Sequence, residues 1–283
     1  MRRAESTPAD DSHDMHDHDR GLAYDLSTLV ERRTVLGLFA GLSVASLVGC
    51  STSSGPSASG STTSAATASA HATGGTCAEI PQETAGPFPG DGSNGPNILT
   101  QSGIVRSDIR PSFGSASAVA TGVPLTINLT ILNTSRGCAA FPGVAVYLWH
   151  CDINGNYSMY SQAVANENYL RGVQESAANG TVTFTSIFPA AYSGRWPHIH
   201  FEIYPSLAQA TAAGSKLATS QLAFPADVCH AVYATDGYGT SVGNLARTSL
   251  ETDMVFRDGF SRQLANVTGS VSSGYVASLS VPV

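Results

Sequence analysis

Short runs of apolar or alternating residues, separated by turn signals, dominate the second half of the chain. In Thr126-Ile127-Asn128-Leu129-Thr130-Ile131, polar and apolar residues alternate, as in a strand with one exposed and one buried face. Dipeptides such as Asn154-Gly155 favour tight turns between such runs. The pattern predicts a mainly β fold, closed as an antiparallel β-sandwich with few helices. The predicted strands are Pro124–Leu132, Val144–Cys151, Gly180–Ile187, His198–Tyr204 and Gln221–Phe224, and the helix candidate is Leu245–Thr252.

The first fifty residues follow a different pattern. Arg32-Arg33 precedes the uncharged apolar stretch Val35–Val48, which ends in Leu47-Val48-Gly49-Cys50. This stretch is too short to cross a bilayer core of roughly 30 Å as a helix, but it suits the apolar region of a signal peptide. The paired arginines resemble a twin-arginine export signal, and the last four residues resemble a lipobox whose cysteine receives lipid. We predict that residues 1–50 are an export signal and that Cys50 is a lipid anchor, so that the mature protein is exported and held at the outer face of the cytoplasmic membrane or secreted. The alternative is an ordinary secretory signal with an unmodified Cys50.

Residues 51–76 consist almost entirely of Ser, Thr, Ala and Gly. Such a segment has too few apolar side chains to offset the chain entropy that is lost on folding. We predict that it is a flexible linker and that one folded domain occupies residues 77–283.

Charge narrows the range of partners. The chain has 283 residues, of which 12% are charged, with 14 Lys and Arg and a net charge of −7. Nucleic-acid binding needs clustered cations, and no such cluster follows Arg33. These features exclude DNA and RNA as partners and leave the lipid anchor as the predicted membrane contact.

Four cysteines remain when Cys50 is assigned to the lipid anchor. An even number of cysteines in an exported protein favours disulfide bonds, and two are expected here. Sequence alone does not choose among the three possible pairings. A zinc site is disfavoured because the chain has no Cys-x-x-Cys pair. The disulfide candidates are Cys77, Cys138, Cys151 and Cys229.

The segment around Trp196-Pro197-His198-Ile199-His200 carries the most informative chemistry. Side chains alternate along a strand, so His198 and His200 are expected on one face and Ile199 on the other. A lone His-x-His pair also occurs without a metal ion. Here it lies close to Tyr192 and Arg195, which makes a metal site the better hypothesis.

Several segments together resemble the intradiol ring-cleavage dioxygenases. Matching stretches follow one another in order over most of Cys77–Pro225, which makes the resemblance specific. They are Glu83–Phe88, Ser107–Arg110, Val146–Ser158, Tyr192–Arg195 with His198–Phe201, and Thr219–Pro225.

The resemblance implies the β-sandwich of that family and a non-haem Fe(III) cofactor. It also implies that a small aromatic diol, a catechol, is opened by O₂ between its two hydroxyls to give a muconate-type diacid. In this interpretation Tyr192 also accepts a proton, Arg195 stabilises negative charge near the ring, and Gln221 orients the substrate. Two phenolates and two neutral imidazoles suit a ferric ion. The implied ligands are Tyr157, Tyr192, His198 and His200.

Three departures limit the analogy with the cytoplasmic catechol enzymes. The interval between Tyr192 and Arg195 is short, so a more open pocket is expected. No helical N-terminal module is visible, and an export signal is present.

The chain has no serine-hydrolase, phosphate-loop or dinucleotide motif. The alternative hypothesis is a catalytically silent β-sandwich lipoprotein that serves as a binding module.

Overall fold

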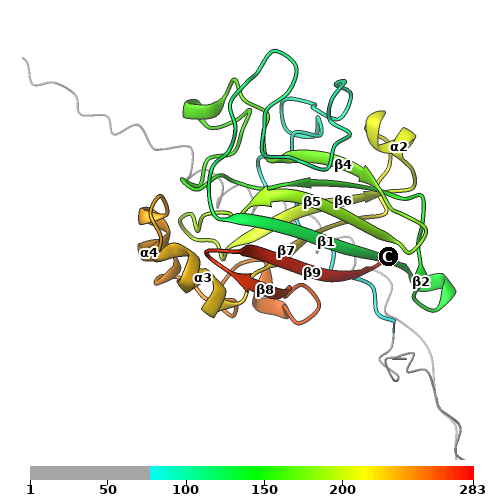
Figure 1. Ribbon diagram of the computed structural model, residues 1–283. Coiled ribbons are helices and arrows are strands. Elements are labelled where there is room, and N and C mark those ends of the chain that lie inside the picture. The colour runs from blue at the N-terminus through cyan, green and yellow to red at the C-terminus, as the bar shows by residue number, and fades with distance from the viewer. Residues whose placement is uncertain (1–76) are drawn as a thin grey trace, which may run out of the picture.

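The computed structural model describes residues 77–283, which form two β-sheets with short helices at both ends (Figure 1). The export signal, the linker and Cys50 lie outside the described residues. Within them, no helix has the length and apolar character of a membrane span. The helices are α2 (Leu207–Thr211), α3 (Ala226–Tyr233) and α4 (Gly239–Leu245), with 3₁₀ turns at Thr134–Arg136, Gln162–Val164 and Phe256–Asp258.

The first sheet has five strands, in the order β2-β1-β9-β8, with β5 also paired to β1. Its pairs are antiparallel except for β1 and β9, which run parallel from Leu125 opposite Tyr275 to Leu132 opposite Pro282. The expectation of an antiparallel sandwich therefore holds with this one exception. The strands are β1 (Pro124–Asn133), β2 (Ala139–Ala140), β5 (Thr181–Ile187), β8 (Asn266–Ser270) and β9 (Gly274–Pro282).

The second sheet has four antiparallel strands in the order β4-β3-β6-β7. Its register places Trp149 opposite His200 and Gln221 on the other side of His200. Residues far apart in the sequence thus meet in one row across three strands. The strands are β3 (Ala145–Trp149), β4 (Arg171–Glu175), β6 (His198–Tyr204) and β7 (Ala218–Ala223).

Alternation along β6 sorts its side chains between two apolar layers. Ile199, Phe201 and Ile203 pack into the main core between the sheets, together with inward residues of β1 such as Ile127. Tyr204 belongs to a second cluster, with Trp149 and Tyr157 among its members. The face of β6 that carries His198, His200 and Glu202 therefore points away from the core between the sheets.

The five predicted strands are all present, within a few residues of the expected ends. The helix predicted at Leu245–Thr252 is wrong, because helix α4 ends at Leu245. After this residue, the side chains of Ser249 and Thr252 hold a turn. The Ser249 N–H donates to Thr252 Oγ1 at 3.0 Å, and the Thr252 N–H donates to Ser249 Oγ at 3.3 Å. Ser and Thr side chains compete with helical hydrogen bonds in this way.

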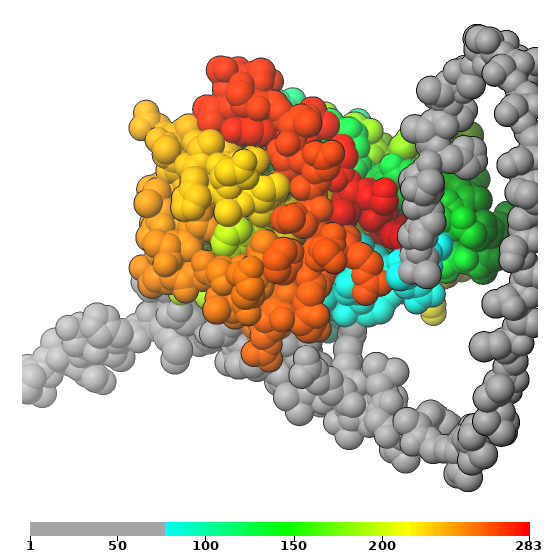
Figure 2. Space-filling model, turned by 90° about the horizontal axis from the view of Figure 1, so that it is seen from below, coloured from blue at the N-terminus to red at the C-terminus, as the bar shows by residue number. Residues whose placement is uncertain are grey.

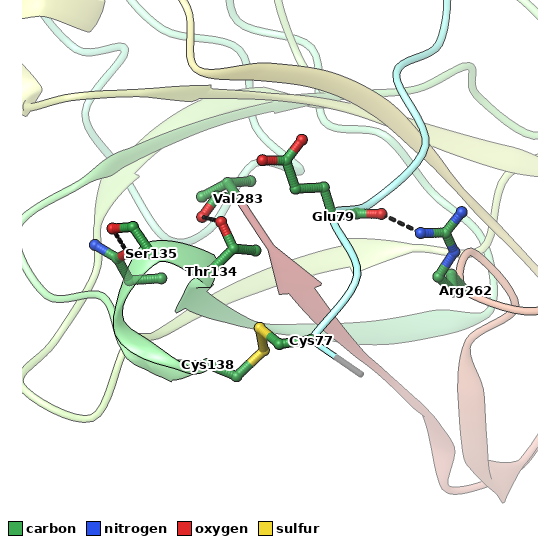
Figure 3. The surroundings of a disulfide bond; sticks show 8 residues. Cys77, Glu79, Thr134, Ser135, Cys138, Arg262 and Val283 are labelled. Carbon is green, nitrogen blue, oxygen red and sulfur yellow. Dashed lines mark hydrogen bonds between the residues drawn. A yellow bond between two sulfur atoms is a disulfide. The ribbon is translucent and has the colours of Figure 1, made fainter. Parts of the chain in front are cut away.

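The two ends of the described chain meet on one face of the molecule. The Ile80 N–H donates to the Pro282 carbonyl at 2.8 Å, and the first described residues (cyan) adjoin the C-terminal ones (orange to red) in Figure 2. Nearby, a disulfide joins Cys77 to Cys138, just beyond the end of β1 (Figure 3). Closing a loop with a sequence separation of 61 stabilises the fold by about 4 kcal/mol.

The second predicted disulfide is wrong, because Cys151 and Cys229 are both free and buried. Cys151 follows β3 in the second cluster, with its sulfur 3.6 Å from the Ala190 carbonyl. Cys229 lies on α3 in the main core. The two thiols thus belong to different layers of the fold.

Candidate metal centre

The four side chains that the sequence analysis singled out as ligands converge on one point. His198 and His200 come from the start of β6, with their Nε2 atoms 3.1 Å apart. The Tyr192 hydroxyl lies 3.1 Å from His198 Nε2 and 3.5 Å from the Tyr157 hydroxyl. Tyr157 and both histidines are buried, whereas Tyr192 is partly exposed.

The turn after β3 shapes the approach of the two phenols. Asp152 accepts hydrogen bonds from the N–H groups of Asn154 and Asn156, at 2.8 and 2.9 Å, which fixes a compact Asx turn just before Tyr157. Gly155 has φ +84°, and a Cβ at this position would lie 3.0 Å from the Tyr192 Cβ. Glycine therefore allows the Tyr192 loop to approach the Tyr157 loop closely. These bonds give Asp152 a structural role in the turn.

The protein orients one nitrogen of His198. Its Nδ1 lies 2.5 Å from the Trp196 carbonyl, so Nδ1 carries the proton and Nε2 offers a lone pair. His200 stacks on Trp149 with 4.9 Å between ring centroids and an interplanar angle of 5°. Its Nδ1 has no hydrogen-bond partner among the described residues.

Burial keeps these groups neutral in the protein alone. It lowers the pKa of His198 and of His200 well below the usual range, with nearby Arg195 adding to the effect. Burial, with Tyr192 close by, likewise raises the pKa of Tyr157 well above that of a free phenol. Neutral imidazoles are ready to bind a metal ion, and a phenol gives up its proton when a metal cation replaces it.

This donor set fits a small, hard cation. Ligand atoms about 2.1 Å from a common ion and at roughly right angles lie about 3 Å apart, close to the separations found here. Among residues 77–283, no group of three or more His, Cys, Asp or Glu side chains is arranged to hold a metal ion. The candidate centre therefore depends on its two phenols, which favour iron in the ferric state over zinc.

Arg195 and Gln221 lie beside this cluster in a buried network. Arg195 Nη2 donates to Gln221 Oε1 at 2.7 Å, and Gln221 Nε2 donates to the Thr84 carbonyl at 2.9 Å. Asp253 Oδ2 accepts from Arg195 Nε at 3.0 Å. Asp253 was not identified from the sequence, because it lies 58 residues from Arg195 in a segment without a motif.

Glu83 closes the network from the N-terminal side. Its Oε1 accepts from Gln263 Nε2 at 3.3 Å, and Gln263 Nε2 also lies 3.3 Å from the Gln221 carbonyl. Burial, followed by the negative charge of Asp258, raises the Glu83 pKa to about 7. The segment Glu83–Phe88 thus covers the site, and Phe88 packs on Tyr157 at 5.0 Å between ring centroids.

Three other buried side chains that could be mistaken for ligands, those of His150, Tyr233 and Tyr238, have other partners. His150 bonds to the Cys151 carbonyl at 2.8 Å and to Ser186 Oγ at 2.7 Å. Tyr233 and Tyr238 donate to the carbonyls of Pro189 and Phe188. His230 is exposed on α3.

Comparison with known proteins places the fold in a defined class. No family model matches the chain. An intradiol ring-cleavage dioxygenase from Tetranychus urticae is 26% identical with a TM-score of 0.52, and the match covers 64% of this chain and 87% of that one. A second solved dioxygenase is 25% identical with a TM-score of 0.53 and the same coverage.

A curated relative gives a shorter match. Chlorocatechol 1,2-dioxygenase from Rhodococcus opacus is 29% identical over 93 residues, which are 29% of this chain and 36% of that protein. The chain thus matches about a third of the length of this relative. Together the matches confirm that the chain resembles the intradiol ring-cleavage dioxygenases, in sequence and in its mainly β fold.

Proposed function

We propose that the protein is a non-haem Fe(III) dioxygenase that cleaves catechol-type rings between the two hydroxyls and gives muconate-type diacids. One observation carries the proposal: two phenols and two neutral imidazoles converge, with neighbouring donor atoms 3.1 to 3.5 Å apart, at the edge of a buried site. The resemblance to ring-cleavage dioxygenases supports the same chemistry. The iron would be held by Tyr157, Tyr192, His198 and His200.

Ferric iron, when bound, would supply the Lewis acidity and the electron transfer that attack of O₂ on an aromatic diol requires. The protein's own residues bind and orient the diol. Tyr192 is the less buried phenol and takes up a proton from the incoming diol. Arg195 provides a fixed positive charge next to the ring, where negative charge develops during cleavage.

Gln221 places its amide between Arg195 and the Thr84 carbonyl, so its orientation is fixed by both neighbours. Because the amide is already oriented, it needs little rearrangement as the reaction proceeds. The partly buried segment Glu83–Phe88, whose Phe88 ring packs on Tyr157, limits the access of water to one side of the site.

Oxygen uptake tests this proposal. Iron-loaded protein is assayed with catechol, protocatechuate, hydroxyquinol and chlorocatechols, and product spectra distinguish cleavage between the hydroxyls from cleavage beside them. We expect uptake with at least one diol, loss of at least 100-fold in His200→Ala, and no change in His230→Ala, which alters an exposed histidine outside the centre. If no diol is consumed and no iron is bound, the hypothesis of an enzyme is wrong, and the hypothesis of a catalytically silent binding module takes its place.

We also propose that the protein is exported and anchored through Cys50. Arg32-Arg33, the apolar stretch Val35–Val48 and Cys50 support this location, and the Cys77–Cys138 disulfide suits an oxidising compartment. Cys50→Ala should release the protein from the membrane fraction of the producing cells. Equal membrane retention of the variant would contradict the anchor.

A further inference from the structure

We infer that Asp253 is a positioning residue that sets both the direction of the Arg195 guanidinium and the path of the backbone leading to His198. The inference rests on the proposed function for its catalytic consequence. The anchoring itself is a property of the protein without iron. Asp253 belongs to the C-terminal region after Pro225, to which the sequence analysis assigned no role.

The first support is the geometry around the Arg195 guanidinium. Arg195 and Asp253 are both buried, with side-chain exposures of 2% and 0%. Asp253 Oδ2 accepts from Nε at 3.0 Å, while Oδ1 lies 3.5 Å from Nη2. Gln221 Oε1 accepts from the same Nη2 at 2.7 Å. Contacts on two sides thus determine the plane of the guanidinium.

The second support is the path from Asp253 to a candidate metal ligand. The Trp196 N–H donates to Asp253 Oδ2 at 2.7 Å, and the Trp196 carbonyl lies 2.5 Å from His198 Nδ1. The Trp196 indole is also fixed, because its Nε1 donates to the Phe224 carbonyl at 2.9 Å. One carboxylate therefore holds the residue that sets the tautomer and orientation of His198.

The third support is that Asp253 is itself rigidly held. Its Oδ1 accepts from the N–H groups of Val255 at 2.8 Å and Phe256 at 3.2 Å, which form the turn that follows it. Both carboxylate oxygens therefore have donors from the adjacent backbone or from the Arg195–Trp196 segment. A carboxylate fixed by these bonds can hold the Arg195 guanidinium and the Trp196 backbone in defined positions.

The test begins with iron-free protein labelled with ¹⁵N. The Arg195 Nε–H is buried against a carboxylate, so its signal should remain visible at pH 8, where exposed arginine signals are lost to exchange with water. Arg195→Lys assigns the signal. Arg171 gives an internal standard for the fold, because its Nε donates to Ser158 Oγ at 3.1 Å in a buried site. In Asp253→Asn we expect the Arg195 signal to shift or vanish and the Arg171 signal to remain.

Kinetics of the iron-loaded protein test the catalytic consequence. Asp253→Asn should lower kcat about 10- to 100-fold with a smaller change in KM, because a displaced Arg195 weakens stabilisation of the transition state. Glu251→Gln, an exposed change in the same segment, should leave kcat unchanged. The double variant Arg195→Lys with Asp253→Asn should be no more than about threefold slower than Arg195→Lys alone, because both changes remove one interaction.

An unchanged Arg195 signal in Asp253→Asn, wild-type kcat in that variant, or fully additive losses in the double variant would overturn the inference. Failure of the proposed function has a different signature. In that case wild-type protein binds no iron and consumes no oxygen, while the NMR comparison still decides whether Asp253 orients Arg195.

Discussion

Two buried polar clusters share one face of strand β6, and they differ in how fully the protein satisfies them. Toward the end of the strand, Glu202 accepts from Lys216 and from the Tyr204 hydroxyl at 2.7 Å, and Lys216 also pairs with Asp91. At its start, His198 and His200 direct their Nε2 atoms at each other, and His200 Nδ1 lacks a partner among the described residues. A cluster whose carboxyls are paired with a cation and with hydrogen-bond donors stabilises the fold, whereas imidazole nitrogens directed at one another favour a ligand between them.

Substitutions in the cluster of Lys216, Glu202 and Asp91 should lower the stability of the fold more than substitutions in the histidine cluster. Lys216 is the chain's only lysine, and Lys216→Met leaves Glu202 and Asp91 buried without their cation. We expect the free energy of unfolding to fall by about 4 kcal/mol at pH 8 and by less at pH 5, where the carboxyls take up protons. Urea unfolding at both pH values checks this, and equal losses at the two pH values would contradict it.

The second prediction concerns Glu83, which adjoins the candidate centre. Its folded-state pKa of about 7 lies above the ordinary glutamate pKa of 4.5, so the folded state binds more protons than the unfolded state between these values. Its contribution to stability is therefore present below pH 4.5 and is lost as pH rises through 7. Glu83→Gln should be more stable than wild type by about 2 kcal/mol at pH 8 and equal to it near pH 4. The exposed change Glu79→Gln is the control, and an equal difference between pH 8 and pH 4 in both variants would contradict the prediction.

The smallest expected effect is a difference in stability loss between the variants of two buried tyrosines, Tyr204 and Tyr157. Tyr204→Phe removes a donor at 2.7 Å from buried Glu202 and should cost about 2 kcal/mol. Tyr157→Phe in iron-free protein should cost less than about 1 kcal/mol, because among residues 77–283 the hydroxyl makes only a long 3.5 Å contact with Tyr192. Thermal unfolding of both variants measures the difference. A larger loss in Tyr157→Phe would make that phenol structural and weaken the comparison.

The sequence was most informative where the pattern was local. Alternation in His198–Tyr204 predicted the strand and the shared face of both histidines, and the ordered family segments pointed to Tyr157 and Tyr192. Their convergence depends on the tertiary fold, which only the resemblance could suggest. The assignment of these four residues as iron ligands stays a prediction.

Other parts could not be predicted, for identifiable reasons. Strand β4 contains Arg171, a residue that rarely lies in a core, yet its guanidinium is satisfied by the carbonyls of Phe88, Pro89 and Ser158. Strand β9 does alternate, but Ala and Ser dilute its hydrophobic signal, and its partner β1 lies far away in the sequence. Asp253 becomes meaningful only when the fold brings it to Arg195.

The visible absorption spectrum of purified iron-loaded protein, together with its iron content, tests the central claim most directly. Wild-type protein should bind one ferric ion and show the red tyrosinate-to-iron charge-transfer band. The band should be strongly reduced or shifted in Tyr157→Phe and retained in Tyr233→Phe, whose buried hydroxyl bonds to the Pro189 carbonyl instead. Colourless wild-type protein, or an unchanged band in Tyr157→Phe, would contradict the claim that two phenols and two imidazoles hold one iron.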